Sequence, residues 1–225
     1  MTQRRAQITG WGKCVPPVKL TNAALEQLVD TSDQWIVERT GMKERGISHV
    51  EVTDLAEVAA KHSLAAAGLE VTDIDLLVMA TVTPEITCPS NACFLQERLG
   101  LVNAAAFDLN AACSGFVYST ATVASMIESG VAERVLVIGA EKLHFVMDYW
   151  DRNQCILFGD GAGAAVFEAT TDGSGVIAHD IGADGVAGRT MVFPTFGSRG
   201  ELDRQRDPAI DRLHFEGQNV FKHAV

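Results

Sequence analysis

The sequence predicts an α/β fold with a mainly parallel sheet, and three segments support this prediction. Residues 74–82 and 134–139 form nearly continuous apolar runs, which are typical of strands buried on both faces of a parallel sheet. Residues 53–69 carry apolar side chains at helical spacing. The alternation of such segments favours right-handed crossovers, so residues that carry chemistry are expected at the carboxyl ends of strands.

The elements near the N-terminus have clear start and stop signals. We expect a strand over residues 6–15 and a helix over residues 22–29, which Thr21 caps. Ser32 should cap a second, shorter helix, and Gly41 should end it in the left-handed conformation.

The second half of the chain is predicted in less detail. Ser90 should cap a helix, and residues 159–163 contain glycines that predict a tight turn before an apolar strand. This turn lacks the Lys-Ser/Thr pair of a phosphate-binding loop, so its expected role is close backbone packing beside Cys113, a candidate nucleophile. We also expect a strand over residues 176–182, a polar surface loop over residues 196–211, and the start of a helix within residues 214–225.

Composition excludes several classes of protein. The 225 residues carry a net charge of −11, which argues against a nucleic-acid surface, and 47% of them are hydrophobic, as in globular proteins. No apolar run approaches the ~18 residues of a transmembrane helix, and no signal peptide is evident, so neither a membrane nor secretion is expected. The five cysteines lack the spacing of a disulfide scaffold or a zinc site. We therefore expect a protein of the reducing cytoplasm that holds no metal.

Cys113 is the candidate nucleophile. It lies between the apolar run that ends at Leu109 and a segment of helical spacing that begins near Phe116. The first N–H groups of a helix have no partner and the macrodipole is positive there, and both effects favour a reactive thiolate. Small neighbours, Ala112 and Gly115 among them, leave room for a substrate carbonyl. The alternative is a buried structural cysteine.

Four ordered segments resemble β-ketoacyl-acyl-carrier-protein synthase III, a thiolase-fold condensing enzyme. They are DTSDQWIVERTG at residues 30–41, DLNAACSGF at 108–116, LFGDGAGAAV at 157–166 and GQNVFK at 217–222. The resemblance runs essentially from end to end. It implies a thiolase-like first half of βαβαβαββ order with a five-stranded, mainly parallel sheet over residues 1–172, and the beginning of a second, truncated half over residues 173–225.

The resemblance implies an acyltransferase that begins fatty acid synthesis. Cys113 would accept the acyl group of an acyl-coenzyme A primer, and malonyl-acyl-carrier protein would then lose carbon dioxide and attack the acyl-enzyme. No cofactor is required, because acyl-coenzyme A is a substrate. The family uses a His and an Asn as well, and no residue of this chain matches either motif. The chain is therefore expected to be an N-terminal portion that acylates itself at most.

Binding residues also follow from the resemblance. Trp35 and Arg39, four residues apart on one helix face, could hold an adenine ring and a phosphate; the alternative is a Trp packed on the core beside a solvated Arg. Arg152, Gln218 and Phe221 match other coenzyme A contacts. Asn153 and Gln218 replace the family's common Gly and Asn at their positions, which puts individual coenzyme A contacts in question.

Cys88 matches the floor of the acyl pocket, where many members carry a Phe that is contributed across the dimer. A homodimer is therefore implied, and the smaller Cys88 predicts longer or branched primers. Other functions remain open: a starter-unit or ester-forming acyltransferase of secondary metabolism, or a non-catalytic dimeric scaffold. A cysteine hydrolase would need a His paired with Cys113, and the sequence offers no such motif.

Overall fold

The computed structural model describes residues 4–192 and 213–224 and divides the chain into two compact units. Unit 1 contains Met1–Pro16, Ser48–Lys142 and Gly161–Ile181, and unit 2 contains Pro17–Ile47, Leu143–Asp160 and Gly182–Val225. The units are therefore interleaved along the sequence. The division at residues 172 and 173 refers to an internal duplication of the family fold and stays a prediction.

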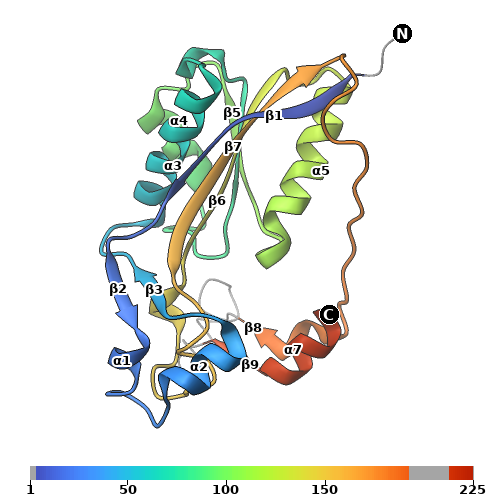
Figure 1. Ribbon diagram of the computed structural model, residues 1–225. Coiled ribbons are helices and arrows are strands. Elements are labelled where there is room, and N and C mark those ends of the chain that lie inside the picture. The colour runs from blue at the N-terminus through green and yellow to red at the C-terminus, as the bar shows by residue number, and fades with distance from the viewer. Residues whose placement is uncertain (1–3, 193–212, 225) are drawn as a thin grey trace. The chain divides into compact units, whose positions relative to one another are not determined.

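Five strands of the described chain form the central sheet of unit 1 (Figure 1). Their order is β1 (Arg5–Cys14), β7 (Asp160–Thr170), β6 (Arg134–Lys142), β4 (Leu76–Ala80) and β5 (Ala105–Leu109). β4 runs parallel to both β5 and β6, whereas β1 is antiparallel to β7. The expected α/β fold is confirmed, and β5 lies at one edge of the sheet.

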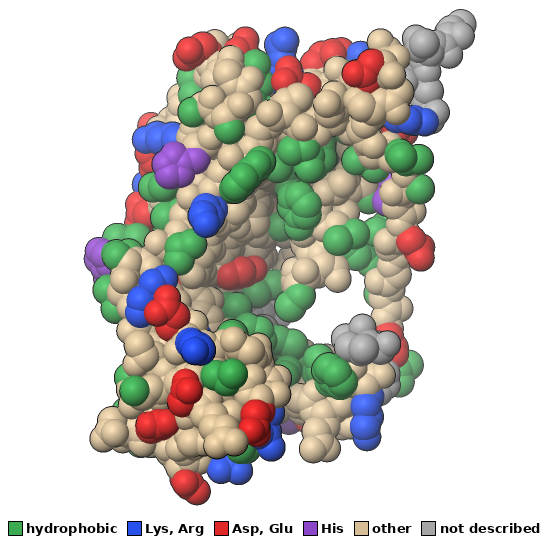
Figure 2. Space-filling model, viewed as in Figure 1, with side chains coloured by type: hydrophobic (Ala, Val, Ile, Leu, Met, Phe, Trp, Pro, Cys, Tyr) green, Lys and Arg blue, Asp and Glu red, His purple; other side chains and the backbone are tan. Residues whose placement is uncertain are grey.

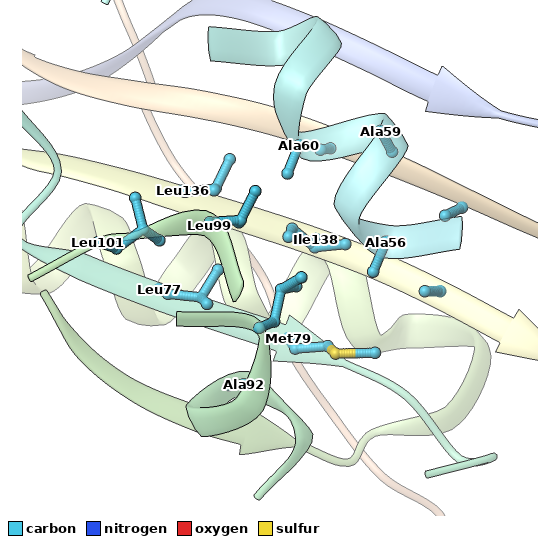
Figure 3. Packing of buried hydrophobic residues seen from close by; sticks show 14 of the residues in the cluster. Ala56, Ala59, Ala60, Leu77, Met79, Ala92, Leu99, Leu101, Leu136 and Ile138 are labelled. Carbon is cyan, nitrogen blue, oxygen red and sulfur yellow. The ribbon is translucent and has the colours of Figure 1, made fainter. Parts of the chain in front are cut away.

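Helices cover both faces of this sheet. α3 (Val52–Ala67) and α4 (Asn91–Leu99) pack on one face, and α5 (Gly115–Glu128) packs on the other (Figure 1). Figure 3 shows Ala56, Ala59 and Ala60 of α3 above Leu136 and Ile138 of β6. All five side chains are fully buried, and burying each large one stabilises the fold by about 1.5–3 kcal/mol.

Small residues let α3 approach β1 closely. A Cβ atom at Gly10 would overlap the backbone carbonyl of Ser63, and one at Gly12 would overlap that of Ala59. Only glycine fits at these two positions. The predicted helix over residues 53–69 is confirmed. It begins at Val52, and Glu51 caps it by forming a capping box with Asp54.

Unit 2 begins with a short hairpin and two helices. β2 (Val18–Thr21) pairs antiparallel with β3 (Glu44–Ile47), and α1 (Asn22–Leu25) follows β2 directly. The Thr21 side chain caps α1 as predicted, but the helix ends at Leu25 and the next residues form turns.

The second helix of unit 2, α2 (Asp33–Thr40), matches its prediction closely. The Ser32 side chain accepts a hydrogen bond from the backbone N–H of Trp35, and Gly41 ends the helix with a φ of 69°. Gly41 therefore supplies the left-handed conformation that L side chains rarely adopt.

The last segments of unit 2 are β8 (Met191–Val192), β9 (His214–Phe215) and α7 (Gly217–Ala224). β8 and β9 pair antiparallel. The predicted C-terminal helix is thus preceded by a short strand. The loop predicted over residues 196–211 lies outside the described residues.

The predictions for two segments of the chain are wrong. Residues 176–182 form no strand: the backbone N–H of Val176 donates to the carbonyl of Ala6 over 2.8 Å, but Ile177 is 82% exposed and no ladder follows. Residues 159–163 form no isolated turn, because β7 already begins at Asp160 and includes Gly161 and Gly163. An apolar run does not by itself supply a pairing partner. Glycines, in turn, can continue a strand where a partner is present, as β1 is for Ala162 and Gly163.

Gly159 does pack closely, as predicted, but against β3. A Cβ atom there would lie 2.9 Å from both the Arg45 Cβ and the Gly46 carbonyl. Arg45 is buried and donates to the Ile156 carbonyl over 2.8 Å from Nε and to the Asn22 side chain over 2.5 Å. The segment therefore joins the hairpin of unit 2, and its proximity to Cys113 stays a prediction.

Candidate active site

Cys113 lies on a strained turn between β5 and α5. Residues Ala112–Ser114 form a 3-10 helix, and Gly115 begins α5. Ala112 has a φ of 46°, a left-handed value that is uncommon for a residue other than glycine and costs on the order of 1–3 kcal/mol. The Cys113 side chain is exposed. Cys113 therefore precedes the α-helix by one short turn and is not buried in the described part of the chain.

A close contact holds this turn at the carboxyl edge of the sheet. A Cβ atom at Gly115 would lie 2.9 Å from the Cβ of Ala80, so α5 can begin here only with glycine. Ala80 is the last residue of β4, and it pairs in register with Leu109 of β5 and Gly139 of β6. The candidate nucleophile thus follows the carboxyl ends of neighbouring parallel strands, the place where α/β proteins carry their chemistry.

Apolar side chains follow the turn on α5. Phe116 and Val117, which follow it on α5, are 46% and 48% exposed, and the Phe116 ring lies 6.5 Å from that of Phe167. Figure 2 shows hydrophobic side chains at the surface over α5 and the neighbouring part of unit 1. An acyl chain attached to Cys113 would therefore find apolar surface next to the thiol.

A partly buried carboxylate that the sequence did not reveal lies at the same edge of the sheet. Glu141, near the end of β6, accepts hydrogen bonds from the backbone N–H of Val82 over 2.8 Å and from the Thr83 hydroxyl over 2.5 Å. The Thr81 hydroxyl also donates to it, over 3.3 Å. Burial raises the pKa of Glu141, and these hydrogen bonds oppose the shift.

Trp35 and Arg39, the predicted binding residues on α2, contact each other. The guanidinium carbon of Arg39 lies 4.2 Å from the Trp35 ring centroid, and that of Arg152 lies 4.7 Å from it. Each guanidinium also donates to a backbone carbonyl: Arg39 to Trp35 over 3.3 Å and Arg152 to Asp30 over 2.9 Å. Trp35 packs against the small core around Ile36 as well, so the alternative of a core Trp is correct for one part of the side chain.

A cavity of about 950 Å3 opens beside this cluster, within unit 2. It brings together segments that are far apart in the sequence: α2, the loop that contains Asp151, and α7. Its lining includes Trp35, Arg39, Asp151, Asn153, Gln218, Phe221 and Lys222. Of the predicted coenzyme A contacts, only Arg152 does not line the cavity, and it lies instead against the Trp35 ring.

Asn153 is oriented by Asp151. The Asn153 backbone N–H and side-chain Nδ2 donate to the same Asp151 oxygen, over 2.8 and 3.1 Å. Because a carboxylate only accepts, this contact assigns Nδ2 to Asp151 and leaves the Asn153 carbonyl oxygen pointing elsewhere. The residue that replaces the family's common Gly thus adds polar groups to the cavity wall.

Cys88 lies in unit 1, on the loop between β4 and α4, and is exposed. In the described part of the chain, no group of three or more His, Cys, Asp or Glu side chains could hold a metal ion. None of the described helices combines the length and the hydropathy needed to cross a membrane.

The sheet, the turn that carries the cysteine and the flanking helices define a thiolase-like fold, and comparisons with known proteins agree. The family model for 3-oxoacyl-[acyl-carrier-protein] synthase III matches residues 107–185. The crystal structure of 3-oxoacyl-[acyl-carrier-protein] synthase III from Aquifex aeolicus superposes with a TM-score of 0.87 and 40% identity, covering 97% of this chain and 67% of that one.

Curated relatives identify the family. The β-ketoacyl-[acyl-carrier-protein] synthase III of Koribacter versatilis is 46% identical over 227 residues, which cover 99% of this chain and 68% of the relative. Synthase III 2 of Vibrio cholerae is 45% identical over 226 residues; the chain spans 62% of that protein's length. The chain belongs to the β-ketoacyl-acyl-carrier-protein synthase III family, which confirms the resemblance found in the sequence.

Proposed function

We propose that the protein is an acyltransferase that starts fatty acid synthesis by decarboxylative condensation. The observation that carries this proposal is the exposed Cys113 on a strained turn at the carboxyl edge of the sheet. The names of the relatives support the same reaction class.

In the first half-reaction, the Cys113 sulfur attacks the thioester carbonyl of an acyl-coenzyme A. A C–S bond forms to Cys113, the bond to the coenzyme A sulfur breaks, and coenzyme A leaves as a thiol after taking up a proton. Backbone N–H groups at the turn are suited to stabilise the oxyanion of the tetrahedral intermediate. The product is an acyl-Cys113 thioester.

In the second half-reaction, malonyl-acyl-carrier protein loses carbon dioxide, and the resulting carbanion attacks the acyl carbon. The bond to Cys113 breaks and the thiolate is restored. Donors that stabilise the enolate oxygen are needed here, and no residue of these 225 matches the family's His or Asn. A polypeptide limited to these residues should therefore acylate itself without condensing. The proposed reaction uses neither a metal nor a redox cofactor.

The cavity of unit 2 is the proposed coenzyme A site. The Trp35 ring offers a stacking surface for adenine, and the guanidinium groups of Arg39 and Arg152 offer charge for phosphates. Gln218 and Phe221 on α7 are proposed contacts of the pantetheine arm.

The edge strand β5 supports a homodimer. An unpaired edge strand exposes backbone N–H and C=O groups that can pair with other chains and cause aggregation. Pairing two identical edges satisfies these groups in both subunits at once. Cys88 is then the proposed floor of the acyl pocket, contributed across that interface. Besides acyl-coenzyme A and a partner subunit, malonyl-acyl-carrier protein is the remaining proposed partner. The cytoplasm is the proposed location.

Mass spectrometry of the intact protein after incubation with acetyl-coenzyme A tests the proposal. We expect a gain of one acetyl group, which Cys113→Ala abolishes and Cys93→Ala, a change of another exposed cysteine, leaves in place. A non-catalytic scaffold would show no acetyl group at all. Acetylation that survives Cys113→Ala would also refute the proposal.

A further inference from the structure

The loop that carries Cys88 is fastened at three places. Where it begins, residues 81–83 donate to the Glu141 carboxylate. In the middle, the Glu85 carboxylate accepts from the backbone N–H of Thr53 over 3.1 Å and from its hydroxyl. At its end the loop meets Asn91, the first residue of α4. Only the segment around Ile86 and Cys88 is left exposed.

Asn91 is fully buried and holds this end of the loop with its side chain. The Glu85 backbone N–H donates to Asn91 Oδ1 over 2.9 Å, and Asn91 Nδ2 donates to the Ile86 carbonyl over 3.0 Å. Nδ2 also donates to a carboxylate oxygen of Asp108 over 3.0 Å. One amide thus satisfies polar groups of the loop and contacts the sheet at the same time.

Asp108 completes the connection from the side of the sheet. It belongs to the edge strand β5, which leads into the Cys113 turn. Its two oxygens accept the backbone N–H groups of Asn91, over 2.7 Å, and of Ala92, over 2.8 Å. These are the unpartnered donors at the start of α4, so a side chain from a neighbouring strand caps this helix.

We propose that Asn91 and Asp108 are positioning residues, which fix the Cys88 loop to the strand that leads to Cys113. The proposal rests on the proposed function in one respect: Cys88 must form the floor of the acyl pocket. The Cys88 loop is then fixed to β5, the proposed dimer strand, so that it forms a fixed floor for the acyl pocket of the partner subunit. Removing the hydrogen bonds of either residue should change which primers are accepted.

Two variants remove the connection, and each has a matched control. Asp108→Asn replaces one carboxylate oxygen by a donor that faces backbone N–H groups. Its control is Asp75→Asn: Asp75 accepts the backbone N–H groups of Glu133 and Arg134 over 2.8 and 3.2 Å, at the opposite end of the sheet.

The second variant, Asn91→Ala, removes the amide. Its control is Asn103→Ala, which deletes a hydrogen bond from an exposed side chain to the Thr72 carbonyl. All four variants are first compared with the unmodified chain by thermal unfolding, so that a general loss of stability is known for each.

The first measurement is hydrogen exchange of the whole chain followed by mass spectrometry. Asp108→Asn should speed exchange at the amide of Glu85 by about tenfold, the size of effect that opening a local hydrogen-bonded segment produces, although Asp108 makes no hydrogen bond to Glu85. Asp75→Asn should leave this amide unchanged. Unchanged exchange in Asp108→Asn and Asn91→Ala would overturn the proposal.

The second measurement is the ratio of hexanoyl to acetyl transfer onto Cys113, taken from mixtures of the two coenzyme A thioesters. A displaced pocket floor should change this ratio by about tenfold in both test variants, and the controls should keep it within about twofold. A uniform loss for both primers would show a merely structural role and refute the proposal. If the unmodified chain takes up no acyl group, the proposed function fails, whereas the exchange result still decides whether these residues fix the loop.

Discussion

The guanidinium carbon of Arg152 lies 4.7 Å from the centroid of the Trp35 ring, and Arg39 approaches the same ring at 4.2 Å. Two like charges repel each other, so placing both against a single indole favours a ligand that brings negative charge. The same indole also has a flat surface for an aromatic base. Phosphate and adenine of one ligand would satisfy both features.

Trp35→Ala should therefore weaken the binding of coenzyme A by about tenfold or more, because stacking of a base on an aromatic ring is worth about 1–3 kcal/mol. Isothermal titration calorimetry of the unmodified chain and the variant measures this. Trp150→Ala is the control, since that ring is 76% exposed and lies outside the lining of the cavity. Equal affinities for Trp35→Ala and the unmodified chain would contradict the assignment.

Cys113 should be the cysteine that reacts fastest with iodoacetamide at neutral pH. It is exposed at the start of a helix, whereas burial raises the pKa of Cys14 and Cys155. Peptide mapping after short labelling times gives the rate at each site. Cys88 and Cys93 serve as internal controls: both are exposed, and Cys93 lies in the first turn of α4, but neither lies on the strained turn at Ala112. Faster labelling of either would refute the assignment.

Cys88→Phe should narrow the range of primers. A Phe side chain fills the space of several methylenes, and each methylene in a fitted pocket is worth about 1–3 kcal/mol, so transfer of hexanoyl groups should fall by tenfold or more while acetyl transfer persists. Cys93→Phe, on α4, is the matched control. Intact-mass measurements of Cys113 acylation with each primer give the two transfer rates. An equal loss for both primers would exclude Cys88 from the pocket floor.

The chain should form a homodimer in solution through β5. Sedimentation equilibrium at micromolar concentration is the direct measurement. Purely monomeric behaviour would count against edge-to-edge pairing, whereas a dimer that persists in high salt would fit an interface built from backbone hydrogen bonds and apolar side chains.

Local signals in the sequence predicted most elements, because those signals act over a few residues. Ser32 and Gly41 delimit α2 through contacts with their immediate neighbours, and the buried run of β4 follows from its apolar side chains. The strand expected over residues 176–182 failed for the opposite reason: a strand depends on a partner that its own sequence does not encode.

The same limit applies to the site. Cys113 could be proposed from its neighbours, whereas Trp35 and Arg39 followed from the resemblance to the family. Ser90 was expected to cap α4, yet its side chain makes no capping hydrogen bond there. Asp108 of β5 caps the helix instead, and Glu141 accepts a hydrogen bond from a residue some sixty positions away in the sequence. Contacts of this kind arise only when the fold has formed, and no short motif reveals them.

The partly buried Glu141 predicts a specific dependence of stability on pH. Burial raises its pKa above that of the unfolded chain. The protonated form is therefore favoured in the folded state, and its contribution to stability is complete below the unfolded pKa, about 4.3, and is lost as pH rises through the folded value. Glu141→Gln cannot ionise, so the free energy of unfolding of the unmodified chain should fall relative to this variant as pH rises. Between the two pKa values the difference should change by up to about 1.4 kcal/mol per pH unit.

Urea unfolding of both proteins at a series of pH values from about 4 to 8 measures this difference, and circular dichroism reports the folded fraction. Glu128→Gln, which changes an exposed residue at the end of α5, is the control and should run parallel to the unmodified chain. In Glu141→Gln the side-chain oxygen can still accept from Val82, and the threonine hydroxyls can turn to accept from the new amide, so the fold should persist. A difference that stays constant over the whole range would show that the Glu141 carboxyl group has the same pKa in the folded and unfolded chains.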